Sequence, residues 1–181
     1  MEIKFRPLKF NEIECRVNQI SDKGLTLLLY KDARCDMNIL DETIGVMNWQ
    51  REHKELKGNI YCGVSIYNKD INQWTTKWDS GKESNTEAVK GEASDSFKRA
   101  CVNWGIGREL YTAPFIWIPN DRCEIKKNDK GKYYTTTKFR VGNISYDEKR
   151  NINGIIIINE KKEVVFKIEP PKKEVQNENN K

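Results

Sequence analysis

The stretch that decides the fold is EAVKGEASDSFKRACVNWGIG, residues Glu87–Gly107. Its apolar residues recur at the spacing of one helix face, which predicts a long helix packed on a sheet. This face consists of Val89, Ala93, Phe97, Ala100, Cys101 and Trp104. Ser84 and Glu87 have the spacing of a capping box, so we expect the helix to begin there. Gly105 and Gly107 are expected to end it.

The same helix carries two adjacent cations, Lys98 and Arg99. At about 100° per residue, both lie off the apolar face, on opposite flanks, and both reach the surface. One interpretation is an ordinary solvated helix face. The other is a pair that contacts phosphates, and composition alone does not distinguish the two.

The segment before this helix shows two further patterns. Alternating apolar residues predict a hairpin of strands 13–20 and 24–30. A change to helical spacing predicts a short helix with Asp32 as its N-cap and its end near Gly45. Its apolar positions are Met37, Leu40, Ile44 and Met47.

Three strands are expected between the two helices, joined by polar turns. They cover residues 48–56, 60–67 and 71–80. Gly63 lies inside the second strand, which indicates either a bulge or a close backbone approach. The simplest topology is an antiparallel meander that leads into the long helix.

Beyond Pro114 the pattern is that of strands again. The expected segments are 115–118, 122–127, 132–139, 139–146, 154–158 and 162–168. Residues 169–181 have little to bury and open with two prolines, so they are predicted to be a disordered polar tail. Residues 1–168 are expected to form a single α+β domain.

Composition limits the class of protein. Of 181 residues, 33% are charged and 10% are aromatic, which is typical of a globular chain. No apolar run approaches the roughly 18 to 20 residues of a membrane span, and the first residues do not resemble a signal peptide, so we expect an intracellular protein. The net charge of +5 lies in the C-terminal third and is compatible with a polyanionic partner.

The cysteines and the single histidine argue against a metal site. Five cysteines are scattered singly, without a CxxC pair, which is typical of reduced thiols rather than of zinc ligands or disulfides. His53 is the only histidine. We therefore expect no metal and no cofactor.

The sequence offers little support for an enzyme. No glycines flank a serine in a nucleophile elbow, and no glycine-rich phosphate loop is present. Two sets of acids near a lysine resemble Mg²⁺-dependent nuclease sites, Asp41 with residues 52–54 and Asp121 with residues 124–126. Such spacings are common by chance in a highly charged chain, so the prediction is a protein that is not an enzyme.

The tryptophans leave two interpretations open. Trp49 and Trp104 are expected in the core. Trp74 and Trp78 are four apart on one strand and so share a face. They either complete a core or form a platform on which unpaired bases stack.

Two blocks in order resemble a known family. ARCDMNILDETIGVMNW, residues 33–49, is similar to its first helix, and EAVKGEASDSFKRACVNWGIG to its basic helix. With the three strands between them, residues from about Arg34 to Leu110 resemble single-strand annealing proteins of the Rad52-like superfamily, including its phage Sak-type members.

The resemblance implies a β-β-β-α core over about residues 32–110, in which an antiparallel sheet packs on a long helix, with additional β-hairpins. It also implies a ring of identical subunits that binds single-stranded DNA in a basic groove. Arg34, Lys98 and Arg99 match the family's DNA-binding positions. Where the family often has another basic residue, this chain has Val102 and Asn103. Lys77, Lys82 and Arg108 are the candidates for compensating contacts.

The function implied is ATP-independent annealing of complementary strands in phage or prophage recombination and DNA repair. The implied partners are single-stranded DNA, further copies of the chain, and a host or phage single-strand-binding protein. The location would be the cytoplasm of a bacterial host. Two alternatives remain, a module that coats single-stranded DNA or RNA without annealing it, and a Mg²⁺-dependent nuclease.

Overall fold

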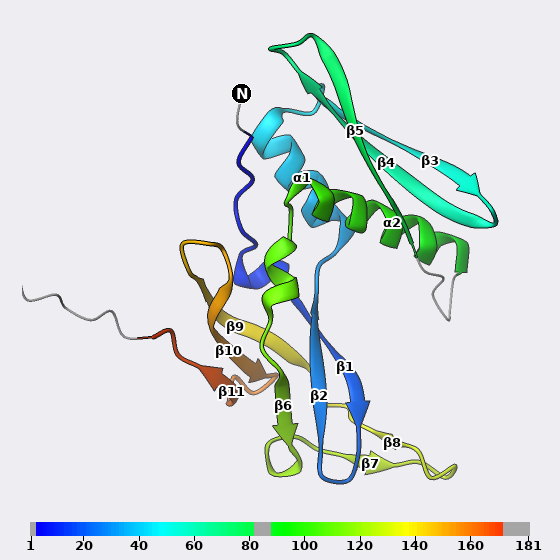
Figure 1. The fold of residues 1–181 in the computed structure, drawn as a ribbon. Coiled ribbons are helices and arrows are strands. Elements are labelled where there is room, and N and C mark those ends of the chain that lie inside the picture. Colours follow the sequence, from blue (N-terminus) through cyan, green and yellow to red (C-terminus); the bar gives the residue numbers. More distant parts are fainter. Residues whose placement is uncertain (1–2, 82–87, 172–181) are drawn as a thin grey trace, which may run out of the picture. The chain divides into compact units, whose positions relative to one another are not determined.

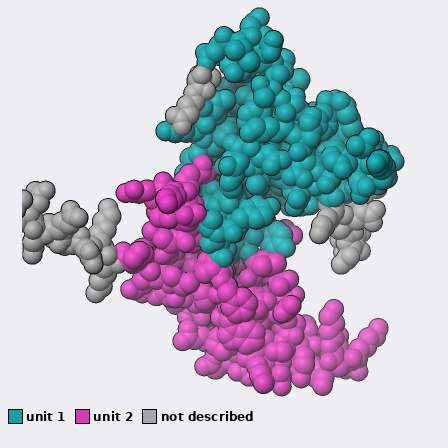
Figure 2. Space-filling view, viewed as in Figure 1, with its two compact units in different colours: residues 1–14, 29–113 teal, residues 15–28, 114–181 magenta. Residues whose placement is uncertain are grey.

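The computed structural model describes residues 3–81 and 88–171, without the side chains of residues 88–90 (Figure 1). The described part is a mixed α+β structure with two α-helices and mostly antiparallel sheets. The chain divides into two compact units, one of residues 1–14 and 29–113 and one of residues 15–28 and 114–181 (Figure 2). That residues 1–168 act as a single domain stays a prediction.

The first helix of the first unit, α1, covers Ala33–Ile44 and confirms the predicted bounds. The side chain of Asp32 accepts a hydrogen bond from the Arg34 amide at 2.7 Å, which is the geometry of an N-cap. Gly45 ends the helix at φ 85°. The predicted apolar face is only partly right, because Leu40 is buried but Met47 lies after the helix and is 84% exposed.

The three predicted strands are confirmed as one antiparallel sheet in the order β3-β4-β5. They cover Trp49–Leu56 (β3), Asn59–Asn68 (β4) and Gln73–Ser80 (β5). Lys57 and Gly58 join β3 to β4 with φ of 54° and 77°, the two positive values that a tight hairpin turn requires. Central β4 contributes the buried residues Cys62, Val64 and Ile66 on one face.

Neither interpretation of Gly63 is right as stated, because the group that approaches it is a side chain and not a backbone segment. The pairing of β4 with both neighbours runs past Gly63 without interruption, so there is no bulge. A Cβ atom at Gly63 would lie 2.7 Å from two ring atoms of Trp78. The missing side chain therefore leaves the space that the indole of Trp78 fills.

The long helix, α2, covers Ala88–Trp104 and packs on β4 and β5 (Figure 1). Phe97, Ala100 and Cys101 are fully buried, which confirms the centre of the predicted apolar face, whereas Ala93 and Trp104 are only partly buried. Ile106 donates to the carbonyl of Cys101 at 3.1 Å and Gly105 to that of Val102 at 2.9 Å, a Schellman end. The predicted capping box at residues 84 and 87 and the side chain of residue 89 lie outside the described part.

The second unit is built on a six-stranded sheet in the order β11-β10-β9-β1-β2-β6. The strands are β1 (Glu14–Ile20), β2 (Gly24–Tyr30), β6 (Ile116–Pro119), β9 (Phe139–Tyr146), β10 (Ile152–Asn159) and β11 (Val164–Ile168). The predicted first and last hairpins are confirmed, since β1 lies next to β2 and β10 pairs with β11. The described part also contains three short 3-10 helices: η1 (Phe10–Glu12), η2 (Arg108–Thr112) and η3 (Asn120–Arg122).

The predicted hairpin around residues 128–131 is much shorter than expected. Its strands are only Lys126–Lys127 (β7) and Tyr133–Tyr134 (β8). Beyond these two strands, threonine hydroxyls form hydrogen bonds in place of main-chain pairing. Thr135 donates to the Glu124 carbonyl at 2.6 Å. In the tail, residues 172–181 lie outside the described part, so the predicted disorder is not tested there.

All five cysteines are free thiols. Burial raises the pKa of Cys15 and of Cys35 to about 12 and that of Cys62 to about 11. These thiols are therefore protonated at neutral pH and chemically unreactive.

The change in the free energy of unfolding caused by Gly63→Ala should have opposite signs with and without the indole of Trp78. With Trp78 present, the new methyl meets the indole, and we expect the free energy of unfolding to fall by about 1–3 kcal/mol. In a Trp78→Ala background, the same change should raise it by about 0.5–1 kcal/mol, because alanine suits a strand better than glycine. Urea unfolding of the four proteins measures this, and an equal cost in both backgrounds would contradict the packing described.

Candidate nucleic-acid interface

Arg34 projects from the first turn of α1 and is more exposed than Lys98 and Arg99. Its side chain is 81% exposed, and its guanidinium donates to both carboxylate oxygens of Asp32, at 3.1 and 2.9 Å. These hydrogen bonds, together with a smaller contribution from the charge of Lys98, lower the pKa of Asp32 to about 2. Arg34 and Lys98 therefore act on the same acidic group.

Lys98 and Arg99 leave α2 on different flanks, as the helical wheel predicts. The ammonium of Lys98 is 4.0 Å from Asp95, one turn earlier on α2, and its side chain is 20% exposed. Arg99 turns toward β5, where its Nε is 3.2 Å from Asp79, and is 44% exposed. The structure thus brings Arg99 to the edge strand of the sheet, and the main-chain carbonyl of Lys98 lies 3.4 Å from Nζ of Lys31, which also bonds Asp36 in α1.

Lys77 and Arg108 lie at the C-terminal end of α2. Lys77 donates to the carbonyl of Asn103 at 2.8 Å, with its ammonium 4.5 Å from the centre of the Trp104 ring. Arg108 donates to the carbonyls of Val102 and Asn103 at 2.9 and 3.2 Å. Both cations therefore satisfy the last carbonyls of the helix. Lys82 lies outside the described residues.

Each of the three main predicted contacts is paired with an acid, and the sequence interpretation missed all three. The acids are Asp32, Asp95 and Asp79. The pair of Arg34 and Asp32 is mainly exposed, and such pairs contribute only about 0–1 kcal/mol, so a phosphate can replace that carboxylate at little cost. Asp79 gave no signal in the sequence, because only the folded sheet brings it to Arg99.

The aromatic residues divide between the two faces of the sheet. Trp49 stacks on Phe97 with ring centres 6.2 Å apart, and Trp104 donates to the carbonyl of Val64 at 2.9 Å. Trp74 and Trp78 alternate with Lys77 along β5 and so lie on the opposite face, 44% and 36% exposed. The two exposed tryptophans are therefore not interleaved with the cations of α2.

The first acid set that resembled a nuclease is not brought together. Asp41 accepts the indole N–H of Trp49 at 2.6 Å, on the α2 side of the sheet. Glu52, an odd number of residues after Trp49 on β3, lies on the other face and pairs with Lys54 at 3.2 Å. In the second set, Glu124 pairs with Lys126 at 3.2 Å. Within the described residues, no group of three or more His, Cys, Asp or Glu side chains could hold a metal ion.

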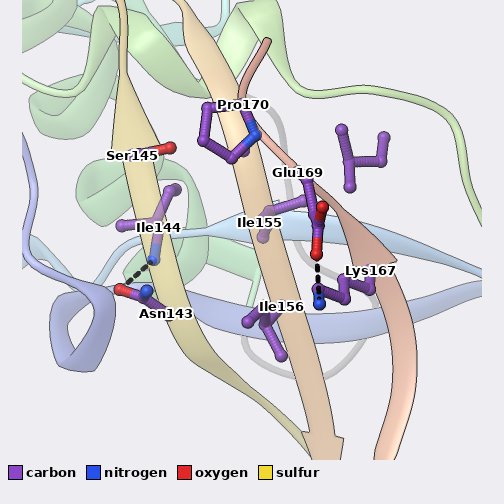
Figure 3. Close-up of a pocket in the computed structure, with 10 residues that line it drawn as sticks. Asn143, Ile144, Ser145, Ile155, Ile156, Lys167, Glu169 and Pro170 are labelled. Atoms are coloured by element: carbon purple, nitrogen blue, oxygen red, sulfur yellow. Dashed lines mark hydrogen bonds and ion pairs between the residues drawn. The ribbon is translucent and has the colours of Figure 1, made fainter. Parts of the chain in front are cut away.

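A pocket of about 380 Å³ lies in the second unit, over β9, β10 and β11 (Figure 3). Its polar residues are Asn143, Ser145, Lys167 and Glu169. Lys167 is paired with Glu169 in the pocket, so the site has no net positive charge. None of the predicted DNA contacts lines it.

Residues 57–128 match the model of the Rad52/22 family double-strand break repair proteins. The matched segment is less than half of the chain and runs from the β3–β4 turn past the end of α2. It includes Lys98 and Arg99, whereas Arg34 precedes it. The match supports the resemblance of this segment to the Rad52-like superfamily.

No curated protein and no solved structure is significantly similar to the chain. Within residues 3–81 and 88–171, no helix is long and apolar enough to cross a membrane.

Two of the predicted contacts should differ in their effect on stability. Arg108→Gln removes the cation that donates to the last carbonyls of α2, and we expect the free energy of unfolding to fall by about 0.5–1 kcal/mol. Arg34→Gln is the matched control, since its mainly exposed side chain bonds an exposed acid, and should change it by less than about 0.5 kcal/mol. Thermal and urea unfolding at low salt compare the two, and an equal loss would argue against the capping role.

Proposed function

We propose that the protein binds single-stranded DNA and anneals complementary strands without ATP. The observation that supports this most is that α2 carries Lys98 and Arg99 at the surface, inside the segment that matches the Rad52/22 family. Arg34, which is paired with Asp32 at the start of α1, adds a third cation. We further propose a role of phage Sak type in recombination and repair, in the cytoplasm of a bacterial host.

The proposed mechanism needs no catalytic residue, metal or nucleotide. Pairing of complementary strands is favourable, and it is slowed by repulsion between phosphates, by structure within each strand and by the search for register. Cations that neutralise the phosphates lower the first barrier. A ring of subunits would extend each strand and so lower the other two. A host or phage single-strand-binding protein would supply the coated strand.

When DNA binds, its phosphates would replace the acids that are paired with the three cations. A phosphate that contacts Arg99 takes the place of Asp79, and one that contacts Arg34 takes the place of Asp32. Phosphate offers a guanidinium the same bidentate geometry as a carboxylate. The acids therefore keep the side chains ordered until DNA arrives.

The double variant Lys98→Ala/Arg99→Ala should lose strand binding while α2 stays folded, because alanine is the best helix former. We expect an affinity for labelled oligo-dT at least tenfold lower at low salt. The slope of log affinity against log salt should fall by at most about 0.7 for each phosphate that the variant no longer neutralises. Fluorescence anisotropy at several salt concentrations measures both quantities.

Lys126→Ala/Lys127→Ala is the matched control, since it removes two adjacent exposed lysines and the same net charge from β7. It should bind nearly as the parent does. If the two double variants weaken binding equally, the assignment to α2 is wrong, and only total charge matters.

Annealing itself is tested with two complementary oligonucleotides that carry a fluorophore and a quencher, without ATP and with EDTA present. We expect the parent protein to accelerate quenching and the Lys98→Ala/Arg99→Ala variant to have little effect. Binding without acceleration would indicate a coating module, and strand cleavage on adding Mg²⁺ would indicate a nuclease. Mass measurement in solution tests the proposed ring.

A further inference from the structure

Lys31 and Asp36 form a buried ion pair that the proposed DNA contacts do not include. Lys31 follows β2 directly and is 5% exposed, and Asp36 lies in the first turn of α1 with no exposed surface. The ammonium of Lys31 donates to Oδ1 of Asp36. Oδ2 of Asp36 has no hydrogen-bond partner among the described residues. Burial raises the pKa of Asp36 to about 6 even though Lys31 lowers it.

Such a pair is a poor source of stability. Removing two charges from water costs several kcal/mol each, and an incompletely bonded carboxylate recovers only part of that. Well-packed apolar residues in the same place are often equally stable or more so. The presence of the pair therefore suggests a geometric role.

The side chain of Lys31 contacts the segments that carry the proposed DNA contacts. Its Nζ is 3.4 Å from the main-chain carbonyl of Lys98, in the middle of α2. Its stem crosses Gly107, where a Cβ atom would lie 2.6 Å from Cδ of Lys31. One side chain thus contacts the first turn of α1, α2 and the turn that follows α2.

We infer that Lys31 and Asp36 are positioning residues that hold the first turn of α1 against α2, so that Arg34 and Lys98 contact the same stretch of phosphate backbone. Arg34 is two residues from Asp36 in that turn, and the carbonyl that Lys31 contacts belongs to Lys98 itself. The role in DNA contact rests on the proposed function. The alignment of the two helices does not.

The first test replaces both charges, as Lys31→Met/Asp36→Leu. This variant leaves no buried charge unpaired, so we expect it to fold. Its affinity for oligo-dT at low salt should fall at least fivefold, and its salt slope should fall by up to about 0.7 for each phosphate that is no longer bound. Ile157→Val, a conservative change at a buried position of the second unit, is the control and should leave the slope unchanged.

The second test keeps both charges and displaces Lys31, in case the first variant does not fold. Gly107→Ala forces a methyl against the Lys31 stem, at a residue with φ 70°. Gly105→Ala is the matched control, since its φ is 96° and a Cβ atom there meets nothing within 4 Å. Both variants carry backbone strain, so only a loss of affinity and slope specific to Gly107→Ala supports the inference.

Hydrogen exchange separates this inference from the proposed function, because it needs no DNA. Amides of residues 33–40 should exchange faster in Lys31→Met/Asp36→Leu and in Gly107→Ala than in the parent and the two controls. Variants that exchange and bind as the parent does would overturn the inference. If exchange is faster but the parent itself binds no single-stranded DNA, the proposed function and the DNA role fail while the alignment of the helices stands.

Discussion

The packing of Phe97, Ala100 and Cys101 on the sheet is the constraint on which the first unit depends. These residues have no exposed surface, so α2 cannot rotate about its axis without exposing them. The rotation of α2 in turn decides where Lys98 and Arg99 point. The same packing holds Trp104 at the carbonyl of Val64 and starts the turn that brings Gly107 to Lys31.

Two kinds of charge pair accompany this packing. The pairs of Arg34, Lys98 and Arg99 with their acids lie at the surface, where water and salt weaken them. The pair of Lys31 and Asp36 is excluded from water and is weakened far less. The surface pairs are suited to exchanging partners, and the buried pair is suited to holding a fixed distance.

Periodicity predicted most elements, because each depends on neighbours in the sequence. The spacing of Phe97, Ala100 and Cys101 was enough to predict α2 and its buried face, and Asp32 and Gly45 were enough to delimit α1. What could not be predicted depends on contacts between distant residues. The pairing of Arg99 with Asp79 requires the register of β5. Lys31 looks like an exposed lysine before a helix cap, and only the approach of Gly107 and Lys98 buries it. Local pattern therefore predicted the scaffold better than the candidate site.

The placement of Trp74 and Trp78 on the face of the sheet away from α2 bears on what a bound strand could do. A strand held by Arg34, Lys98 and Arg99 would be held through its phosphates, without these two indoles stacking on its bases. The bases would then remain free to pair with the complementary strand and to stack on one another in the new duplex. Such a surface would release a finished duplex more readily than an aromatic platform, and it would treat all sequences alike.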